Sequence, residues 1–335
     1  MFREAAQSAE CVHLQLERNR AIVESLAARL RARPPRALAT CARGSSDHAA
    51  TFMRYLVEMR LKLLTSSLSP SVSSVYGIRQ DLRDCLLLAY SQSGRSPDLL
   101  AAVDSAARAG AMVVAVVNEP ESPLARAAQH VLPLYASPET SVAATKSYVA
   151  MLAASLQLVA AWTFDAALEQ ALESLPALLE RAWTLDWSAA LAPLAAAEHL
   201  LVVGRGPGLA IAQEAALKLK ETCGLHAEAF SGAELRHGPM ALVGRQVPVL
   251  ILTQPDETRA GLEALAEDLL RRSVPVLLAG PPCAGVLHLP LPEAGAAVQP
   301  LATAVAFYRL ANALALRRGH DPDAPPLLRK VTETH

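Results

Sequence analysis

Short apolar runs alternate with amphipathic stretches along most of the chain. Each run ends in a polar turn and leads into apolar residues at helical spacing. Strands that are apolar throughout, alternating with helices, are typical of a parallel sheet with helices on both faces. The pattern predicts an α/β fold with buried strands at 37–42, 85–90, 113–117, 200–203, 249–252 and 276–279.

The two halves of the chain repeat this pattern at a fixed distance. Three strand ends recur 162 residues later: Gly44 at Gly206, Gln92 at Gln254, and Asn118 at Gly280. A repeat of this length indicates a duplicated α/β unit, each copy being a small parallel sheet between helices. We expect an N-terminal helical segment at 1–30, a first domain at 31–170, a second domain at 171–320 and a tail at 321–335 that closes over the active site.

The composition favours a globular protein with large cores. Of the 335 residues, 52% are hydrophobic and 19% are charged, which suits two domains. The most apolar segment, 148–164, is interrupted by Ser155 and Gln157 and is short for a membrane span, so we expect a buried helix there. The formal net charge of -1 and the lack of a long basic run argue against nucleic acid as a partner.

The N-terminus and the cysteines favour a cytoplasmic protein. The first residues are amphipathic and charged, without the apolar core of a signal peptide. The five cysteines form no CxxC pair, which fits reduced, mostly buried thiols better than disulfides or a zinc site. We expect no membrane association, no metal and no cofactor.

A hydroxyl-rich turn follows the run at 85–90. It contains Ser91, Gln92, Ser93 and Ser96, and Pro97 then suits the first turn of a helix. Free N–H groups at the positive end of a helix dipole, together with neutral hydroxyl donors, favour reversible binding of a phosphate. An ordinary capped turn between a strand and a helix is the alternative, because serines begin many helices for structural reasons alone.

A second hydroxyl turn follows the run at 37–42 and carries Ser45 and Ser46 before a helical pattern at 49–59. In an open parallel sheet the turns after neighbouring strands converge on one ligand, so the two turns could hold one phosphate. The glycines at 204–208 do not have the GxGxxG spacing, which disfavours a dinucleotide fold. In the second copy Pro255 and Asp256 replace the serine and glycine, so we expect the anion only in the first half.

Three further segments carry reactive side chains. Lys218 and Glu221 stand three apart on one helix face, where a surface ion pair is the alternative to a catalytic pair. His237 lies between an arginine and a Gly-Pro turn, which suits a loop that presents its imidazole to a ligand, although structural histidines are commoner. Lys330 follows a proline-rich approach and could be delivered to a pocket by the C-terminal tail.

Together these motifs resemble the SIS (sugar isomerase) family of phosphosugar proteins. Within that family the chain resembles more closely the isomerase half of the glutamine:fructose-6-phosphate amidotransferases, from about residue 37 to 332. The resemblance implies two tandem SIS domains, each a three-layer sandwich of the flavodoxin or Rossmann kind. The motifs that carry it lie at 44–46, 91–94, 139–146, 216–221 and 234–239.

The resemblance also implies residue roles. Ser46, Ser91, Gln92, Ser93 and Ser96 would hold the 6-phosphate of a sugar, with Ser45 and Val142 lining the same pocket. Glu221 would move a proton between C1 and C2, and Lys218 would contact the sugar near these carbons. His237 would assist ring opening from the partner subunit of a homodimer with composite sites. Lys330 would correspond to the family's lysine that forms a Schiff base with the keto sugar.

Two departures from the family pattern bear on function. The family tail reads lysine, serine, valine, threonine, whereas Lys330 here is followed directly by Val331 and Thr332. The amidotransferases carry a glutaminase domain with a cysteine after the initiator methionine, where this chain has Phe2, so we expect no use of glutamine.

The function expected from these departures is a deaminase that converts glucosamine 6-phosphate into fructose 6-phosphate and ammonia, as in the SIS-type glucosamine-6-phosphate deaminases that the chain resembles. A deglycase or deaminase of another aminosugar or fructosamine 6-phosphate is one alternative. A non-catalytic phosphosugar-binding regulator is another.

Overall fold

The computed structural model describes residues 1–330 and contains two compact units. The N-terminal sheet unit comprises 10–139, 146–173 and the described residues 329–330. The C-terminal sheet unit comprises 1–9, 140–145 and 174–328. Of the tail expected at 321–335, residues 331–335 lie outside the described residues.

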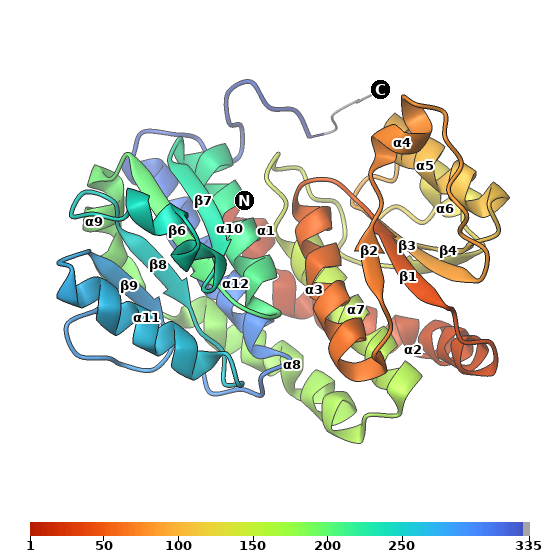
Figure 1. The fold of residues 1–335 in the computed structure, drawn as a ribbon, viewed down its shortest axis with the longest axis horizontal. Coiled ribbons are helices and arrows are strands. Elements are labelled where there is room, and N and C mark those ends of the chain that lie inside the picture. The colour runs from red at the N-terminus through yellow and green to blue at the C-terminus, as the bar shows by residue number, and fades with distance from the viewer. Residues whose placement is uncertain (331–335) are drawn as a thin grey trace. The chain divides into compact units, whose positions relative to one another are not determined.

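The N-terminal sheet unit holds five strands (Figure 1). Helices α2 and α8 each cross a unit boundary. The elements are α2 (Ser8–Ala32), β1 (Ala37–Cys41), α3 (Ser45–Leu61), β2 (Thr65–Ser67), α4 (Pro70–Ser74), β3 (Cys85–Ser91), α5 (Pro97–Arg108), β4 (Met112–Val117), α6 (Pro123–Ala127), β5 (His130–Pro133), α7 (Lys146–Thr163) and α8 (Ala166–Thr184).

The C-terminal sheet unit also holds five strands. Its elements are α1 (Phe2–Ala6), η1 (Ser188–Ala190), α9 (Leu191–Ala196), β6 (His199–Gly204), α10 (Gly208–Cys223), β7 (His226–Ser231), η2 (Glu234–Arg236), η3 (Pro239–Leu242), β8 (Val249–Leu252), α11 (Arg259–Arg271), β9 (Val276–Ala279), β10 (Leu287–Leu289) and α12 (Gln299–Arg317).

The two sheets share one topology. Their strand orders are β2-β1-β3-β4-β5 and β10-β9-β8-β6-β7, and all pairings are parallel. In both sheets the first strand along the chain lies inside the sheet and the second forms one edge next to it. The remaining three strands follow in order on the other side of the first strand. The register agrees as well, because Thr40 pairs with Leu88 and, 162 residues later, Val202 pairs with Leu250. The expected duplication of an α/β unit is confirmed.

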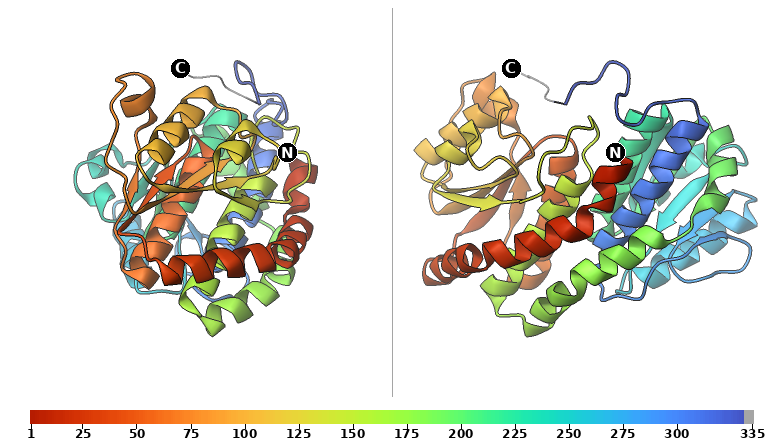
Figure 2. Two further views of the ribbon diagram at one scale, coloured as in Figure 1. Left: turned by 90° about the vertical axis from the view of Figure 1, so that its right-hand side faces the viewer. Right: turned by 180° about the vertical axis from the view of Figure 1, so that it is seen from behind.

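The inner strands of each sheet are buried on both faces, which explains their nearly continuous apolar sequences. All seven residues of β3 are buried. In the N-terminal sheet unit, α5 and α6 pack on one face, where Leu87 of β3 meets Leu99 of α5, and α3 and α7 lie on the other. In the C-terminal sheet unit, α11 covers one face and α10 with α12 the other (Figure 2). The three-layer arrangement predicted from the sequence is therefore present twice.

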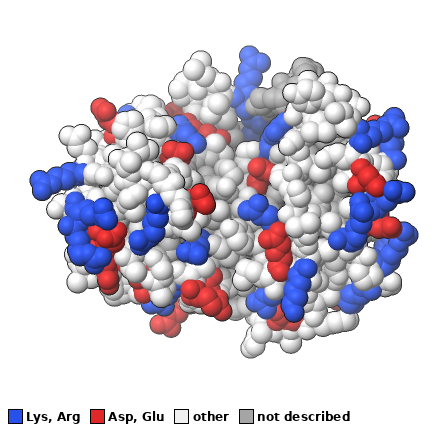
Figure 3. Space-filling view, viewed as in Figure 1, with Lys and Arg blue, Asp and Glu red and all other residues white. Residues whose placement is uncertain are grey.

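The apolar segment at 148–164 forms most of α7, a helix buried along nearly its whole length. Within residues 1–330, no helix is long and apolar enough to cross a membrane. The five cysteines are all free thiols, and four of them are buried, as expected. On the face shown in Figure 3, acidic and basic side chains are interspersed, in keeping with the formal net charge of -1.

Candidate functional site

The two hydroxyl-rich turns lie at the switch point of the N-terminal sheet. They follow β1 and β3, which are hydrogen-bonded neighbours. From β1 the chain continues to the edge strand β2, whereas from β3 it continues to β4 on the opposite side. Ligands of open α/β sheets bind in the crevice that forms where the strand order reverses in this way. The turns therefore converge, as expected from the sequence.

The first turn is tighter than predicted. Helix α3 begins at Ser45, whereas the sequence pattern placed its start near Ala49. Gly44 makes the early start possible, because its φ of 56° lets the chain reverse directly after β1. Ser45 and Ser46 thus occupy the first helical turn, where N–H groups lack intrahelical acceptors. Burial raises the pKa of the Asp47 carboxyl in the same turn, which disfavours negative charge beside a bound anion.

A hydrogen bond within the second turn stabilises its conformation. Ser91 is the last residue of β3 and is buried, and its Oγ accepts a hydrogen bond from Gly94 N–H at 2.9 Å. The Gly94 carbonyl in turn accepts a hydrogen bond from Leu124 N–H. Gln92 and Ser93 between them are half-buried. Ser96 stands at the N-cap of α5 as predicted, but its hydroxyl makes no capping hydrogen bond. That hydroxyl is therefore not committed to the helix.

An ion pair that was not predicted from the sequence joins the two turns. Arg43, from the first turn, donates from Nε and Nη2 to Asp98 Oδ2 at 2.9 and 2.7 Å. Asp98 lies in the first turn of α5, and its side chain is 2% exposed, whereas that of Arg43 is 54% exposed. The sequence did contain a signal for the position of Asp98: its carboxylate directly follows Pro97 in the first turn of α5, where the helix dipole favours negative charge. The pair neutralises Asp98 and leaves the hydroxyls and helix N–H groups as the donors of the candidate site.

The corresponding crevice of the C-terminal sheet is filled by its own side chains. Gln254 Nε2 donates to the Arg205 carbonyl and to Asp256 Oδ2. Asp256 also accepts hydrogen bonds from the N–H and hydroxyl of Thr258. A Cβ added to Gly208 would lie 2.7 Å from Gln254 Oε1, so the amide sits directly against the start of α10. These contacts support the expectation that an anion binds in the first copy.

Helix α10 carries a buried ammonium between two carboxylates. Lys218 Nζ is paired with Glu221 and lies 3.6 Å from Glu214 Oε1. The side chains of Lys218 and Glu214 are each 1% exposed, and that of Glu221 is 21% exposed. Tyr308 of α12 donates its hydroxyl to Glu214 at 3.1 Å. The alternative of a surface ion pair is thus wrong. Glu214 was missed, although its spacing of four residues from Lys218 was visible in the sequence.

The Lys218, Glu214 and Glu221 side chains form a cluster in which one carboxylate, that of Glu221, is partly exposed. A buried ammonium needs compensating negative charge, and the buried Glu214 carboxylate supplies part of it. Glu221 completes the cluster and is the more exposed of the two carboxylates. A carboxylate held in this way, in a partly dry site, can accept a proton from an acidified C–H bond.

His237 lies on an exposed loop of the C-terminal sheet unit. It follows η2, and its backbone N–H donates to the Glu234 carbonyl at 2.9 Å. Leu235, which is fully buried, anchors the loop, and Gly238 turns it with a φ of 134°. Within residues 1–330 the imidazole makes no hydrogen bond. The imidazole is therefore exposed. That it meets a ligand stays a prediction.

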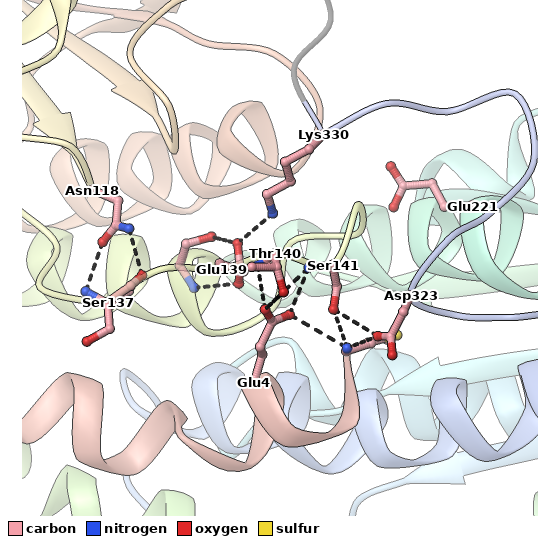
Figure 4. A network of polar contacts seen from close by, with 12 residues as sticks. Glu4, Asn118, Ser137, Glu139, Thr140, Ser141, Glu221, Asp323 and Lys330 are labelled. Atoms are coloured by element: carbon pink, nitrogen blue, oxygen red, sulfur yellow. Dashed lines mark hydrogen bonds and ion pairs between the residues drawn. The ribbon is translucent and has the colours of Figure 1, made fainter.

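Lys330 is paired with a carboxylate of its own unit (Figure 4). Its Nζ lies 3.1 Å from Glu139 Oε2, and its side chain is 24% exposed whereas that of Glu139 is fully buried. Ser147, at the start of α7, donates to Glu139 from its N–H at 3.2 Å and from its hydroxyl at 2.6 Å. Glu139 belongs to a motif noted in the sequence but received no role there. Val331 and Thr332, which complete the tail motif, lie outside the described residues.

The candidate residues divide between the two units. The two turns and Lys330 belong to the N-terminal sheet unit. Lys218, Glu221, His237 and Val142 belong to the C-terminal sheet unit. Val142 is half-buried, and its N–H donates to the Asp323 carbonyl at 3.3 Å. Within the described part of the chain, no group of three or more His, Cys, Asp or Glu side chains is spaced to hold a metal ion.

Two parallel sheets of one strand order, with hydroxyl turns at the switch point of the first, define a tandem α/β protein of duplicated origin. The chain belongs to the SIS domain family, whose model matches residues 33–161 and 193–279. Both matched ranges begin just before the first strand of a sheet.

Three similar proteins illustrate the family. The glutamine–fructose-6-phosphate aminotransferase (isomerizing) of Symbiobacterium thermophilum is 35% identical over 326 residues, covering 91% of this chain and 52% of that protein. The chain thus spans about half the length of this curated relative. A protein of Silicibacter pomeroyi provisionally assigned as a phosphosugar isomerase is 41% identical, with a TM-score of 0.90 over 96% of this chain and 99% of that one. The glucosamine-6-phosphate deaminase of Thermotoga maritima shares the fold, with a TM-score of 0.75 at 21% identity over 97% of this chain and 100% of that one.

Proposed function

We propose that the protein is a phosphosugar aldose-ketose isomerase and deaminase that converts glucosamine 6-phosphate into fructose 6-phosphate and ammonia. The observation that carries the proposal is the buried Lys218 ammonium with the partly exposed Glu221 carboxylate on α10. Membership of the SIS family and similarity to a protein assigned as a phosphosugar isomerase support the substrate class. Similarity to an aminotransferase that acts on fructose 6-phosphate supports an amine at C2.

The 6-phosphate would bind between the two turns of the N-terminal sheet. Ser46, Ser91, Gln92, Ser93 and Ser96 would hold it, with Ser45 beside them and Val142 lining the sugar. Hydroxyls and helix N–H groups are neutral donors, and Arg43 is already paired with Asp98. Such a site binds a phosphate without a cluster of free guanidinium groups, which suits a substrate that must also leave.

The proton shift would run through Glu221. After ring opening, assisted by His237, Glu221 removes the proton from C2 of the amino aldehyde and returns it to C1, while a proton passes from the C2 amino group to the C1 oxygen. This leaves an imine at C2, which water hydrolyses to the ketone and ammonia. Lys218 holds the Glu221 carboxylate in place and contacts the sugar near the reacting carbons. Lys330 would be available for a Schiff base with the keto sugar once its proton is lost.

We further propose that the active form is a homodimer in which each His237 serves the partner's site. The exposed imidazole on an anchored loop supports this arrangement. Closed twofold symmetry would allow both sites to form from the same surfaces.

One alternative uses the same groups on another amine. A deglycase, or a deaminase of another aminosugar 6-phosphate, requires the same proton shift and the same phosphate turns. A non-catalytic phosphosugar sensor is less well supported, because phosphate recognition alone gives no reason for a fixed carboxylate beside a buried ammonium.

A substrate panel tests the proposal. Glucosamine 6-phosphate, galactosamine 6-phosphate and a fructosamine 6-phosphate are incubated with the protein and with Glu221→Gln, and released ammonia or amine is measured. We expect Glu221-dependent ammonia release to be fastest from glucosamine 6-phosphate. Faster release from another substrate would select the deglycase or the other aminosugar. Binding without any turnover would select the sensor.

A further inference from the structure

Two histidines lie side by side at the amino ends of β6 and β7 in the C-terminal sheet unit (Figure 1). His199 is the first residue of β6 and His226 is the first residue of β7, and the two are direct partners in the parallel pairing of these strands. Paired residues point to the same face of a sheet, and neighbouring strands lie about 4.8 Å apart. The backbone of the sheet therefore fixes the separation of the two side chains.

The two imidazole rings bring the same nitrogen atom of each histidine together. The Nδ1 atoms of His199 and His226 are 3.0 Å apart, and the rings meet edge to face at an angle of 82°. A hydrogen bond between two Nδ1 atoms requires one of them to donate and the other to accept, so the accepting ring is neutral. Both side chains are exposed, and the pair is therefore accessible to a dissolved ion.

The separation of the two nitrogen atoms suits two neighbouring ligands of one metal ion. Bonds between imidazole nitrogen and a divalent transition metal are about 2.0–2.1 Å long. Two nitrogens at that distance from one ion lie roughly 2.9 Å apart at a bond angle of about 90°, and roughly 3.3 Å apart at the tetrahedral angle. The observed 3.0 Å is close to the first value. Angles near 90° are typical of square-planar or tetragonal Cu²⁺ and Ni²⁺.

Metal binding requires only a turn of each ring. In the hydrogen bond the nitrogen lone pair of the accepting ring points at the other ring, whereas the two lone pairs must converge beside that line to share an ion. Rotation of a histidine ring about χ2 is broad, and both side chains are exposed, so the rings can turn without repacking of the core. The ion displaces the proton shared by the Nδ1 atoms, and this proton passes to solvent. Each Nε2 then carries the remaining ring proton.

We propose that His199 and His226 together bind one divalent late transition-metal ion, Cu²⁺ more tightly than Ni²⁺. Imidazole nitrogens suit both metals, and Cu²⁺ forms the stronger complexes with a given set of ligands. No group of three or more His, Cys, Asp or Glu side chains among residues 1–330 is spaced to hold an ion, so water completes the coordination. The inference is independent of the proposed reaction, in which neither histidine has a role.

Calorimetric titration of the full chain, without an affinity tag, with CuCl₂ and with NiCl₂ tests the inference. We expect one Cu²⁺ ion to bind per chain at the pair. His199→Asn and His226→Asn each remove one of the two ligands and should weaken Cu²⁺ binding about 10²-fold, because the second ligand of a linked pair acts at a high effective concentration. His13→Asn removes an exposed histidine of α2 and is the matched control, which should bind Cu²⁺ like the unchanged chain.

Electron paramagnetic resonance of the Cu²⁺ complex identifies the ligands. Nitrogen hyperfine structure should report two imidazoles in the unchanged chain and one in His199→Asn or His226→Asn. The inference is overturned if Cu²⁺ binds no more tightly than about 100 µM, or if both variants bind it like the unchanged chain. An equal loss in His13→Asn would show adventitious binding to scattered histidines and would also overturn it. Ammonia release is measured separately in metal-free buffer, so failure here is distinguishable from failure of the proposed reaction.

Discussion

At the scale of single residues, the buried Lys218 ammonium determines how the carboxylates of α10 are held. An unpaired Lys218 at 1% exposure would be strongly disfavoured, and the carboxylates of Glu214 and Glu221 compensate it. Tyr308 fixes Glu214 from α12. The carboxylate of Glu221 is therefore positioned by packing and charge before any ligand arrives. Such preorganisation is what a general base needs.

Glu221→Gln should separate catalysis from binding. The amide keeps the shape of the side chain, and Glu214 still compensates Lys218, so the fold and the affinity for glucosamine 6-phosphate should be retained within about tenfold. Turnover should fall by about 10²- to 10⁴-fold, which is the typical contribution of a general base. Steady-state kinetics and calorimetric affinity measure the two effects. Equal losses of rate and affinity would instead make Glu221 a structural partner of Lys218.

Glu4 makes the stability of the C-terminal sheet unit depend on pH. Burial raises the pKa of Glu4, but hydrogen bonds from Ser141 and Thr140 outweigh it and lower the pKa from 4.5 to about 2 (Figure 4). A carboxyl whose pKa is lower in the folded state stabilises the fold above its unfolded value. Its contribution is therefore present above pH 4.5 and is lost as the pH falls towards 2.

We expect Glu4→Gln to reduce this dependence. Urea unfolding at pH 6 and pH 3 should show a smaller loss of stability on acidification for the variant than for the unchanged chain. Glu267→Gln, on the exposed side of α11, serves as the control and should behave like the unchanged chain. Parallel losses for Glu4→Gln and the unchanged chain would contradict the assignment.

At the scale of elements, backbone geometry at strand ends shapes the candidate site. Gly44 and Gly94 have positive φ values of 56° and 62°, and each reverses the chain just after a strand. The reversals bring the first turns of α3 and α5 to the edge shared by β1 and β3. The Arg43–Asp98 pair then ties one turn to the other. The proposed phosphate site therefore depends on two strand–turn–helix units together.

Gly94→Ala should distort the second turn. A Cβ there would lie 2.2 Å from Ser122 Oγ, in addition to the strain of a positive φ. Gly77→Ala is a matched control, because its φ of 64° is nearly the same but nothing lies within 4 Å of the added Cβ. Strain alone costs about 1–2 kcal/mol, so Gly94→Ala should destabilise the chain by more than Gly77→Ala. It should also weaken binding of inorganic phosphate. Chemical denaturation and calorimetry measure both effects, and equal behaviour of the two variants would refute the clash.

At the scale of the whole molecule, duplication has been followed by specialisation. The two sheets keep one strand order and one register. The crevice of the first copy is edged by hydroxyl groups, whereas Gln254 and Asp256 close that of the second. The second copy instead contributes α10 and the His237 loop to the proposed reaction. Each copy therefore retains the fold and provides different chemistry.

A mixing experiment tests the composite dimer. Glu221→Gln and His237→Ala are each expected to be inactive alone. If His237 serves the partner's site, a mixed dimer contains one site with both residues intact. Equal mixing with free exchange should therefore restore about a quarter of the sites. Ammonia release before and after exchange measures the recovery. No recovery, despite exchange demonstrated by mass spectrometry, would place His237 in its own subunit's site or outside the reaction.

The local pattern of the sequence was sufficient for the fold class. Strands buried on both faces must be apolar along their length, so β3 and β8 stand out without further information. The repeat of 162 residues could also be found without the structure, because only the positions of strand ends in the sequence need to be compared. The same holds for the positions of Ser93 on its turn and of Lys218 on its helix, whereas the start of α3 at Ser45 was not predicted. Their roles in substrate binding and catalysis remain predictions.

The contacts that define the environment of those residues depended on tertiary structure. Burial of Lys218 requires α12 to cover α10, and no pattern within α10 specifies that. Arg43 and Asp98 are 55 residues apart and meet only because β1 and β3 pair. Glu139 and Lys330 are separated by 191 residues. The sequence determined which elements form and which chemical groups they carry. The packing decided which groups meet and which lose their water, because both depend on neighbours that are distant in the chain.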